Sequence, residues 1–353
     1  MSELGYVTSR LQPSVYYNQS LDSIIVVHVD DFMISAAPET LEYVKKRLSE
    51  KFEFTSTILG PGVKDAHETT YLNRTIRWLP TGVLEYEADI KHVGILFREH
   101  GLEHAKQVST PMTKEIQQKL GSGEMLEASE ASWLRRGIAR VNYMAQDRPD
   151  LTYAARELSR FMAVPTEGTK AGLSHVIRYL RLHPRCVQSW RPEEFSDKPL
   201  VEVLTDSDWA TDPSTRKSVS GGVVRFMGVT VCHWSKHQSS VALSSAEAEF
   251  NAVVKGLVEG IHVANLTEEI LGKEVQIVVS TDASACKGML LRSGVGKLKH
   301  MSTKQLWAQG AIASFGISVQ KIGRSINSAD CFTHVLSYQE LIDHCHRMGF
   351  RFA

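Results

Sequence analysis

The chain has 353 residues, of which 42% are hydrophobic and 23% charged, and its formal net charge is zero. This composition is typical of a folded globular protein with two or three domains, and it excludes the disordered and fibrous classes. No apolar run is long enough to cross a bilayer and no secretory signal opens the chain, so we expect an intracellular protein of the cytoplasm or nucleus, without a membrane partner.

The first 108 residues are predicted to form two hairpins and two helices, because β-rich runs and helically spaced apolar residues alternate with turn signals. Strands are expected at residues 14–17, 23–29, 70–78 and 82–88, and helices at residues 38–52 and 89–103.

Residues 108–125 are polar and rich in turn-forming residues, which predicts a linker. Two helical stretches follow at residues 131–162 and 169–183, and a charged, proline-containing stretch at 191–199 marks the next boundary. We therefore predict a helical segment over residues 109–195.

From residue 200 the pattern changes to three strands, a long helix, a strand and several short elements. Strands are expected at 200–205, 220–227, 229–234, 275–281 and 315–322, and helices at 244–271, 283–292, 301–314 and 328–336. The long helix opens with the capping-box sequence Ser244-Ser245-Ala246-Glu247 and ends at Gly272. This order predicts an α/β (α+β) domain over residues 200–340, followed by a C-terminal tail at 341–353.

Five scattered cysteines, without any C-x-x-C pair, predict neither a disulfide framework nor a cysteine zinc site. The run His344–Cys345–His346 contains metal-ligand types, but three adjacent residues cannot all face one ion. We therefore interpret this run as a surface cluster.

Positive charge is unevenly distributed along the chain. Residues 170–191 and 283–329 contain no acidic residue, although both stretches carry several lysines and arginines. Such stretches are usually solvated faces, but two of them in a neutral chain favour a polyanionic partner.

Four acids lie where strands end and helices begin. Asp206 follows the first strand of the last domain, Glu249 lies in the first turns of the long helix, Asp282 ends the fourth strand and Asp330 begins the final helix. Each alone is more simply a surface or capping acid. Together they favour a cluster that needs divalent cations, because like charges raise each other's pKa and hard oxygen ligands suit Mg²⁺. Two such ions about 3.5–4 Å apart activate water and stabilise the leaving oxygen of a phosphodiester.

The sequences around these acids resemble the RNase H domain of copia-type retrotransposon polyproteins. They are TDSDWATDPSTRKSVSG around Asp206, VALSSAEAEFNAV around Glu249 and VVSTDASA around Asp282. SINSADCFTHVL around Asp330 resembles the family's final D-x-L-T-K segment, and CHWSKHQ also has a counterpart. The similarity covers about residues 200–336.

The N-terminal part resembles the same polyprotein, in the same order. VVHVDDFMIS is similar to the reverse-transcriptase YVDD box, with His28 in place of the usual Tyr, and VSTPM and YMAQDRPDLTYAARELSRFM also have counterparts. The chain therefore resembles the C-terminal part of a copia-type LTR retrotransposon polyprotein. The resemblance implies a partial reverse-transcriptase palm and a following segment over residues 1–108, and a helical thumb- or connection-like segment over 109–195. It implies an RNase H-like fold with a mixed five-stranded sheet flanked by helices over 200–340.

Two departures from the family pattern affect the expected activities. A complete palm needs a third Asp from an earlier strand, but only Asp22, in the apparent turn, precedes Asp30. We interpret Asp30 and Asp31 as a relic polymerase site and expect polymerase activity to be lost by truncation. A His in a loop before the last acid, which assists product release in many cellular RNases H, is not evident, and Arg324 is the nearest basic residue.

The resemblance assigns Asp206, Glu249, Asp282 and Asp330 as catalytic ligands of two Mg²⁺ ions, with Mn²⁺ as a substitute. We expect the following residues to contact nucleic acid: Lys236, Ser244, Ser245, Ser284, Lys297, Lys299 and His300. His300 is interpreted as a phosphate contact or a surface residue rather than a catalytic group.

The predicted function is metal-dependent endonucleolytic hydrolysis of the RNA strand of RNA–DNA hybrids. The hybrid is the expected partner, with other products of a retroelement polyprotein as further partners. The alternative is an inactive or co-opted remnant that binds nucleic acid without cleaving it. A cellular RNase H is a third interpretation, against which the reverse-transcriptase-like N-terminal half argues.

Overall fold

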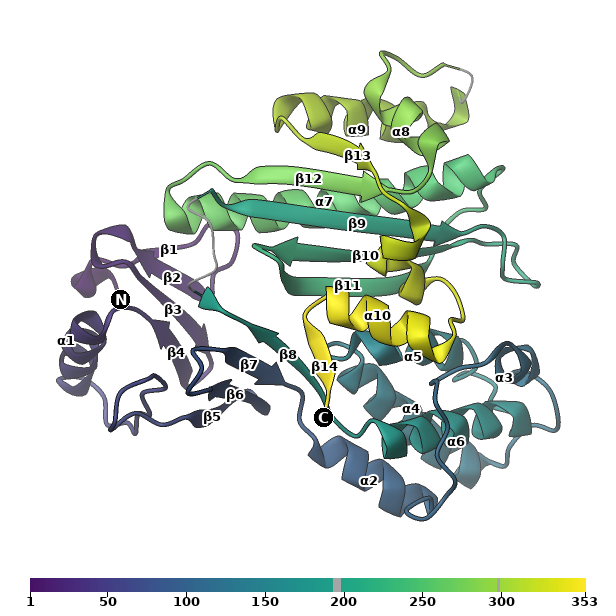
Figure 1. The fold of residues 1–353 in the computed structure, drawn as a ribbon, viewed down its shortest axis with the longest axis horizontal. Coiled ribbons are helices and arrows are strands. Elements are labelled where there is room, and N and C mark those ends of the chain that lie inside the picture. Colours follow the sequence, from purple (N-terminus) through teal and green to yellow (C-terminus); the bar gives the residue numbers. More distant parts are fainter. Residues whose placement is uncertain (193–197, 297–298) are drawn as a thin grey trace.

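The computed structural model describes residues 1–192, 198–296 and 299–353 and shows an α/β protein with three β-sheets in these residues (Figure 1). Within the described ranges, no helix combines the length and apolar character that crossing a bilayer requires.

The first sheet lies at the N-terminus and is antiparallel throughout, in the order β1-β2-β3-β4. Its strands are β1 (Val7–Thr8), β2 (Val15–Asn18), β3 (Ser23–His28) and β4 (Asp31–Ser35), and α1 (Pro38–Ser49) packs beside them. Strand β4 was not predicted. Because Val29 and Asp30 make the tight turn between β3 and β4, with Val29 at φ 57°, the usual Gly or Asn signal for a hairpin is missing.

The second sheet joins distant parts of the chain, in the order β14-β8-β7-β6-β5. Its strands are β5 (Glu68–Tyr71), β6 (Arg74–Trp78), β7 (Leu84–Glu87), β8 (Cys186–Trp190) and β14 (Phe350–Phe352). The stretch predicted as one strand at 70–78 is a hairpin, which turns at Leu72 and Asn73 with positive φ. Residues 341–353, predicted as a tail, instead form most of α10 (Tyr338–Arg347) and the strand β14.

A layer of helices packs around its own apolar core. The helices are α2 (Lys91–His100), α3 (Lys114–Lys119), α4 (Ala128–Met144), α5 (Pro149–Ser159) and α6 (Glu167–Leu182). The predicted linker at 108–125 is part of this core, because Met112 and Leu120 are buried and Ile116 packs against the same cluster. Ile116 lies in α3, and Met112 and Leu120 flank the helix at its two ends, an apolar spacing of four residues that the polar composition had concealed.

The third sheet is mixed, in the order β11-β10-β9-β12-β13. Its strands are β9 (Leu200–Asp208), β10 (Val219–Phe226), β11 (Val229–His237), β12 (Gln276–Thr281) and β13 (Ser318–Lys321). The first three are antiparallel, whereas β12 runs parallel to β9 and β13 parallel to β12. The expectation of a mixed five-stranded sheet flanked by helices is confirmed.

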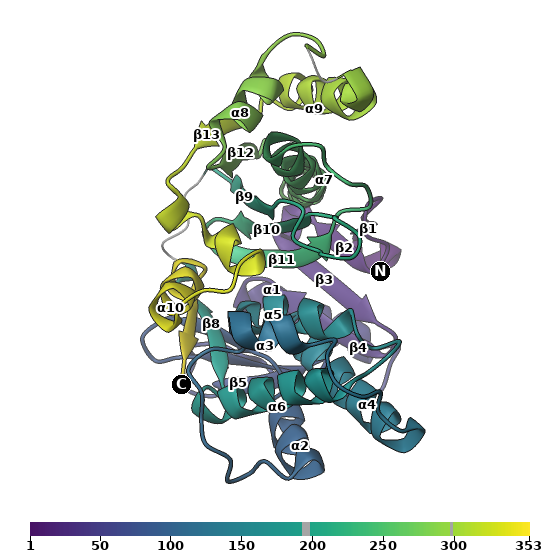
Figure 2. The same ribbon diagram turned by 90° about the vertical axis from the view of Figure 1, so that its right-hand side faces the viewer.

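Helix α7 (Ser245–Leu271) covers one face of this sheet, and α8 (Ser284–Leu291) and α9 (Ser302–Ser314) lie beyond its β12–β13 side (Figures 1 and 2). The opposite face meets α5, α10 and a short 3-10 helix, η6 (Ser328–Phe332), where a longer helix at 328–336 was predicted. The other short 3-10 helices are η1 (Ser2–Leu4), η2 (Gln19–Leu21), η4 (Lys299–Met301) and η5 (Arg324–Ile326).

All five cysteines are free, so the prediction of no disulfide framework is confirmed. The interpretation of residues 344–346 as a surface cluster is wrong for two of them. His344 and Cys345 are buried on the inner face of α10, and only His346 is exposed. The reason is the amphipathic character of α10, whose buried face also contains Leu341.

Candidate active site

Asp206 lies inside β9, because this strand continues to Asp208 rather than ending at residue 205 as predicted. The side chain is nearly fully buried, and only 4% of its surface is exposed. In the antiparallel pairing with β10, Asp206 is opposite Gly221.

Gly221 allows η6 to approach the sheet closely. A Cβ at this position would lie 2.8 Å from Phe332 Cβ and 2.9 Å from the Ala329 carbonyl oxygen, so no larger residue fits without a shift. The buried Asn327 side chain adds a second tie, since its Nδ2 donates to the Thr205 carbonyl oxygen at 3.0 Å. These contacts bring Asp330, the predicted fourth acid, next to Asp206.

Helix α7 is held against β9 by two glycines one turn apart. A Cβ on Gly256 or Gly260 would lie 2.5–2.6 Å from side-chain atoms of Thr205 and Val203, so the helix and strand are in direct backbone-to-side-chain contact. This close packing places Glu249, in the first turns of α7, beside Ser207. One carboxylate oxygen of Glu249, Oε1, accepts from the Ser207 amide at 3.2 Å and from the Ser207 hydroxyl at 2.9 Å.

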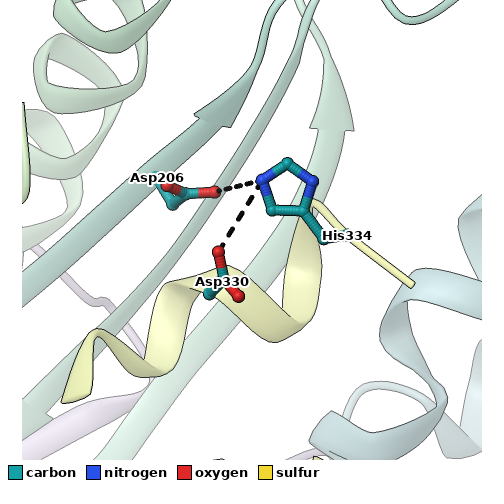
Figure 3. Close-up of side chains that lie close together, drawn as sticks. All are labelled: Asp206, Asp330 and His334. Atoms are coloured by element: carbon teal, nitrogen blue, oxygen red, sulfur yellow. Dashed lines mark ion pairs between the residues drawn. The ribbon is translucent and has the colours of Figure 1, made fainter. Parts of the chain in front are cut away.

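Asp282 directly follows β12, which is parallel to β9, so both strands bring an acid to the same end of the sheet. Side-chain oxygens of Asp206, Glu249 and Asp282 lie within 4.8 Å of one another. Ligand atoms of Asp206, Asp330 and His334 form a second group within the same limit (Figure 3). The structure therefore brings together all four predicted acids, with Asp206 common to both groups.

The electrostatics of the site reflect burial and mutual repulsion. Burial, with the charges of Asp330 and Asp282, raises the pKa of Asp206 to about 7, although the hydroxyl of Thr333 donates to its carboxylate. Burial and the neighbouring Asp206 raise the pKa of Glu249 to about 8. At Asp206, burial therefore outweighs the opposing effects of the Thr333 hydroxyl and the His334 ring on the pKa.

The donor set fits a divalent cation. Glu249 Oε2 is buried and has no hydrogen-bond partner among the described residues. An unpaired buried carboxylate oxygen is costly unless a cation satisfies it. Oxygen ligands from several carboxylates are those that Mg²⁺ and Mn²⁺ prefer.

His334 was not predicted as a site residue. Its Nε2 lies 3.5 Å from Asp206 Oδ2 and 3.7 Å from Asp330 Oδ1, and its Nδ1 lies 3.4 Å from Asp208 Oδ2. His334 follows Asp330 by four residues and replaces the Lys of the D-x-L-T-K segment. This spacing could have indicated from the sequence that His334 lies near Asp330. Arg324, noted as the nearest basic residue, also reaches Asp330, with Nε donating to Oδ1 at 3.3 Å.

Three serines that were expected to contact nucleic acid lie near the acids in the sequence. Ser244 is the N-cap of α7 and accepts from the Glu247 amide at 3.2 Å, while Ser245 is exposed. The expected capping box is only half formed, because the Glu247 carboxylate accepts from the Leu243 amide and not from the amide of Ser244. Ser284 is exposed next to Asp282 and accepts from Lys321 Nζ at 2.6 Å.

The other residues expected to contact nucleic acid are three lysines and a histidine. Lys236 is exposed on β11, two strands away from Asp206. His300 Nε2 lies 3.1 Å from Glu247 Oε2. Lys297 falls outside the described residues, and Lys299 begins η4.

Asp30 and Asp31 are both exposed at the β3–β4 turn. Neither belongs to the metal-ligand groups that the described residues contain. Their assignment as a relic polymerase site stays a prediction.

The basic stretch at 170–191 is largely occupied by contacts within the protein. Lys170 pairs with Glu130 at 2.8 Å and Arg185 with Glu87 at 2.6 Å. Arg178 and Arg181 each donate to a backbone carbonyl, of Lys106 and Ala105 respectively. These cations stabilise the helical layer, so this stretch provides less support for a polyanion surface than its composition suggested.

No family model matches the chain. Among curated proteins, it is 27% identical over 344 residues, 95% of its length, to the retrovirus-related Pol polyprotein from transposon RE1 of Arabidopsis thaliana. It is 26% identical over 353 residues to the corresponding polyprotein from transposon TNT 1-94 of Nicotiana tabacum. These matches cover 22% and 25% of the two relatives, so the chain spans about a quarter of their length. Among solved structures, LC11-RNase H1 from compost matches 39% of this chain and 93% of its own, with 15% identity and a TM-score of 0.31.

Proposed function

Since the chain belongs to the retrovirus-related Pol polyproteins of copia-type retrotransposons, we propose that residues 200–340 act as a metal-dependent endoribonuclease on RNA–DNA hybrids. The observation that carries this proposal is the convergence of four acids, remote in sequence, on one end of a mixed sheet. A structural role would not require three carboxylates within 4.8 Å of one another with one buried oxygen unpaired.

The two ligand groups assign the acids to two metal ions. Asp206, Glu249 and Asp282 would hold one divalent ion, and Asp206 with Asp330 a second. Bound in this way, two ions supply an activated water and stabilise the leaving oxygen of the phosphodiester. The protein residues fix the positions of these oxygens: Ser207 orients Glu249, Thr333 orients Asp206, and Arg324 holds Asp330.

Selectivity for the hybrid is expected to come from shape and from 2′-hydroxyl contacts on the RNA strand rather than from base readout. Ser245 and Ser284 are exposed beside the acids, and Lys236 lies further along the same sheet. Contacts from such residues to sugar and phosphate position a duplex without reading its sequence.

The proposal is tested with one RNA strand, labelled at its 5′ end, offered as an RNA–DNA hybrid, as an RNA duplex and as a single strand. With Mg²⁺ we expect internal cleavage of the hybrid alone, and with EDTA no cleavage. Asp343→Asn is the matched control, because this acid accepts a hydrogen bond from Gln339 on α10 and belongs to neither ligand group of the described residues, so its hybrid cleavage should equal that of wild type.

Hybrid that is bound but never cut, with Mg²⁺ or Mn²⁺, would contradict the proposal. That result would support the alternative of a retroelement remnant that binds nucleic acid without catalysis. Equal cleavage of the hybrid and the RNA duplex would contradict hybrid specificity alone.

A further inference from the structure

His334 is held from one side by a carboxylate and points with its other nitrogen into the acid cluster. Nδ1 lies 3.4 Å from Asp208 Oδ2, and Nε2 faces Asp206 and Asp330 (Figure 3). Ligand atoms of Asp206, Asp330 and His334 lie within 4.8 Å of one another. Histidines that bind a metal commonly have a carboxylate beside the ring nitrogen that does not bind it.

The distances on the Nε2 side are longer than hydrogen bonds and close to those between two ligands of one ion. Nε2 lies 3.5 Å from Asp206 Oδ2 and 3.7 Å from Asp330 Oδ1, beyond the 2.7–3.2 Å range of an N–H···O bond. Two ligand atoms each about 2.1 Å from a shared metal are separated by roughly 3.0–3.4 Å, depending on the coordination angle. Small movements of the three side chains would complete such a shell.

We propose that His334 is a nitrogen ligand of the ion held by Asp206 and Asp330, and that this half of the site selects a transition-metal ion such as Mn²⁺ over Mg²⁺. Imidazole suits first-row transition metals, whereas Mg²⁺ prefers an all-oxygen octahedral shell with several waters. The inference rests on the metal centre of the proposed function, but it does not require that the centre cleaves RNA.

His334 replaces a Lys of the resembling segment. The resembling D-x-L-T-K segment has Lys here, and Lys is a cation that cannot ligate a metal while protonated. The rival interpretation is that His334 acts in the same way, as a positive counter-charge to the acids. His300 provides an internal contrast, because its Nε2 lies 3.1 Å from Glu247 Oε2, a distance typical of a hydrogen bond.

The direct test is pulsed electron paramagnetic resonance of tag-free full-length protein with one equivalent of Mn²⁺, which detects ¹⁴N coupled to the manganese. We expect ¹⁴N modulation in wild type and its loss in His334→Gln. His262→Gln is the matched control, since His262 is exposed on α7, and it should retain the signal. Absence of ¹⁴N modulation in wild type, or its persistence in His334→Gln, would overturn the proposal.

A second variant keeps the test independent of folding. His334→Lys restores the residue of the resembling segment and should lower Mn²⁺ affinity at least about tenfold while leaving Mg²⁺ affinity within a factor of about two, as titration calorimetry would show. Unchanged affinity for both ions would contradict ligation and favour a counter-charge role, because Lys supplies the same positive charge. Equal losses for both ions would also contradict a ligand that selects Mn²⁺. Because neither readout uses RNA, a nitrogen signal in a protein without nuclease activity would sustain this inference while the proposed function fails.

Discussion

Asp206 and Glu249 make the stability of the metal-free protein depend on pH. Their folded-state pKa values, about 7 and about 8, lie above the ordinary range of a carboxyl group because burial penalises the charged form and the acids repel one another. A raised carboxyl pKa contributes stability below the unfolded-state pKa and loses it as pH rises through the folded-state value.

We therefore expect the free energy of unfolding of the wild-type protein in EDTA to fall as pH rises from 5 to 8. The fall in Asp206→Asn should be smaller than in wild type by on the order of 2 kcal/mol. The Asn variant has no charge to desolvate and also relieves Glu249. Urea unfolding at several pH values measures both proteins. Parallel pH curves for the two proteins would show that the acids do not repel one another in the folded state.

At the scale of elements, the close approach of η6 to β10 explains how Asp330 reaches the site. Gly221→Ala adds a Cβ less than 3 Å from atoms of Phe332, Thr333 and Ala329. We expect a loss of about 1–3 kcal/mol in the free energy of unfolding and slower hybrid cleavage, because η6 must shift and carry Asp330 with it.

Gly310→Ala in α9 is the matched control for this change. No atom lies within 4 Å of its added Cβ, so the substitution should raise stability by up to about 1 kcal/mol. Thermal unfolding and cleavage assays of the two variants distinguish them. Wild-type stability in Gly221→Ala would mean that η6 is not packed on the sheet as described.

The elements that the sequence predicted correctly are those with strong local signals. Helix α7 has a Ser N-cap, a terminal Gly272 and helically spaced apolar residues, and the β10–β11 hairpin turns at Gly228. The strands β8 and β14 were missed because they are short and pair with partners far away in the sequence, as in the pairing of β14 with β8. Strand β4 was missed because its turn with β3 lacks a Gly or Asn signal. The four acids were identified from their sequence context, whereas His334 required knowledge of which way its ring faces.

Across the molecule, the last residues of the chain pack against elements that are far away in the sequence. Strand β14 pairs with β8, and α10 and β14 bury four side chains in a core shared with Val223 and Phe332, namely Leu341, Cys345, Met348 and Phe350. The domain boundaries predicted at residues 108, 195 and 340 stay predictions, but this packing connects the last residues to a strand that precedes residue 195.

Removal of residues 338–353 is therefore expected to destabilise the protein by more than about 4 kcal/mol, since each fully buried apolar side chain contributes about 1.5–3 kcal/mol. Removal of the exposed Ala353 alone is the control and should change nothing. Urea unfolding compares the two truncations with wild type. An unchanged midpoint for the longer truncation would show that α10 and β14 are peripheral to the fold.

Asp206→Asn removes the carboxylate that both ligand groups of the described residues share, so this variant shows whether the acid cluster holds the ions that cleave the RNA strand. The measurement is the rate of hybrid cleavage in Mg²⁺ beside hybrid affinity in Ca²⁺, for wild type and variant. We predict a fall in rate of more than about 100-fold with affinity changed less than about threefold, because even outer partners of metal ligands cost 10- to 100-fold when removed. Cleavage by Asp206→Asn at the wild-type rate would contradict the account.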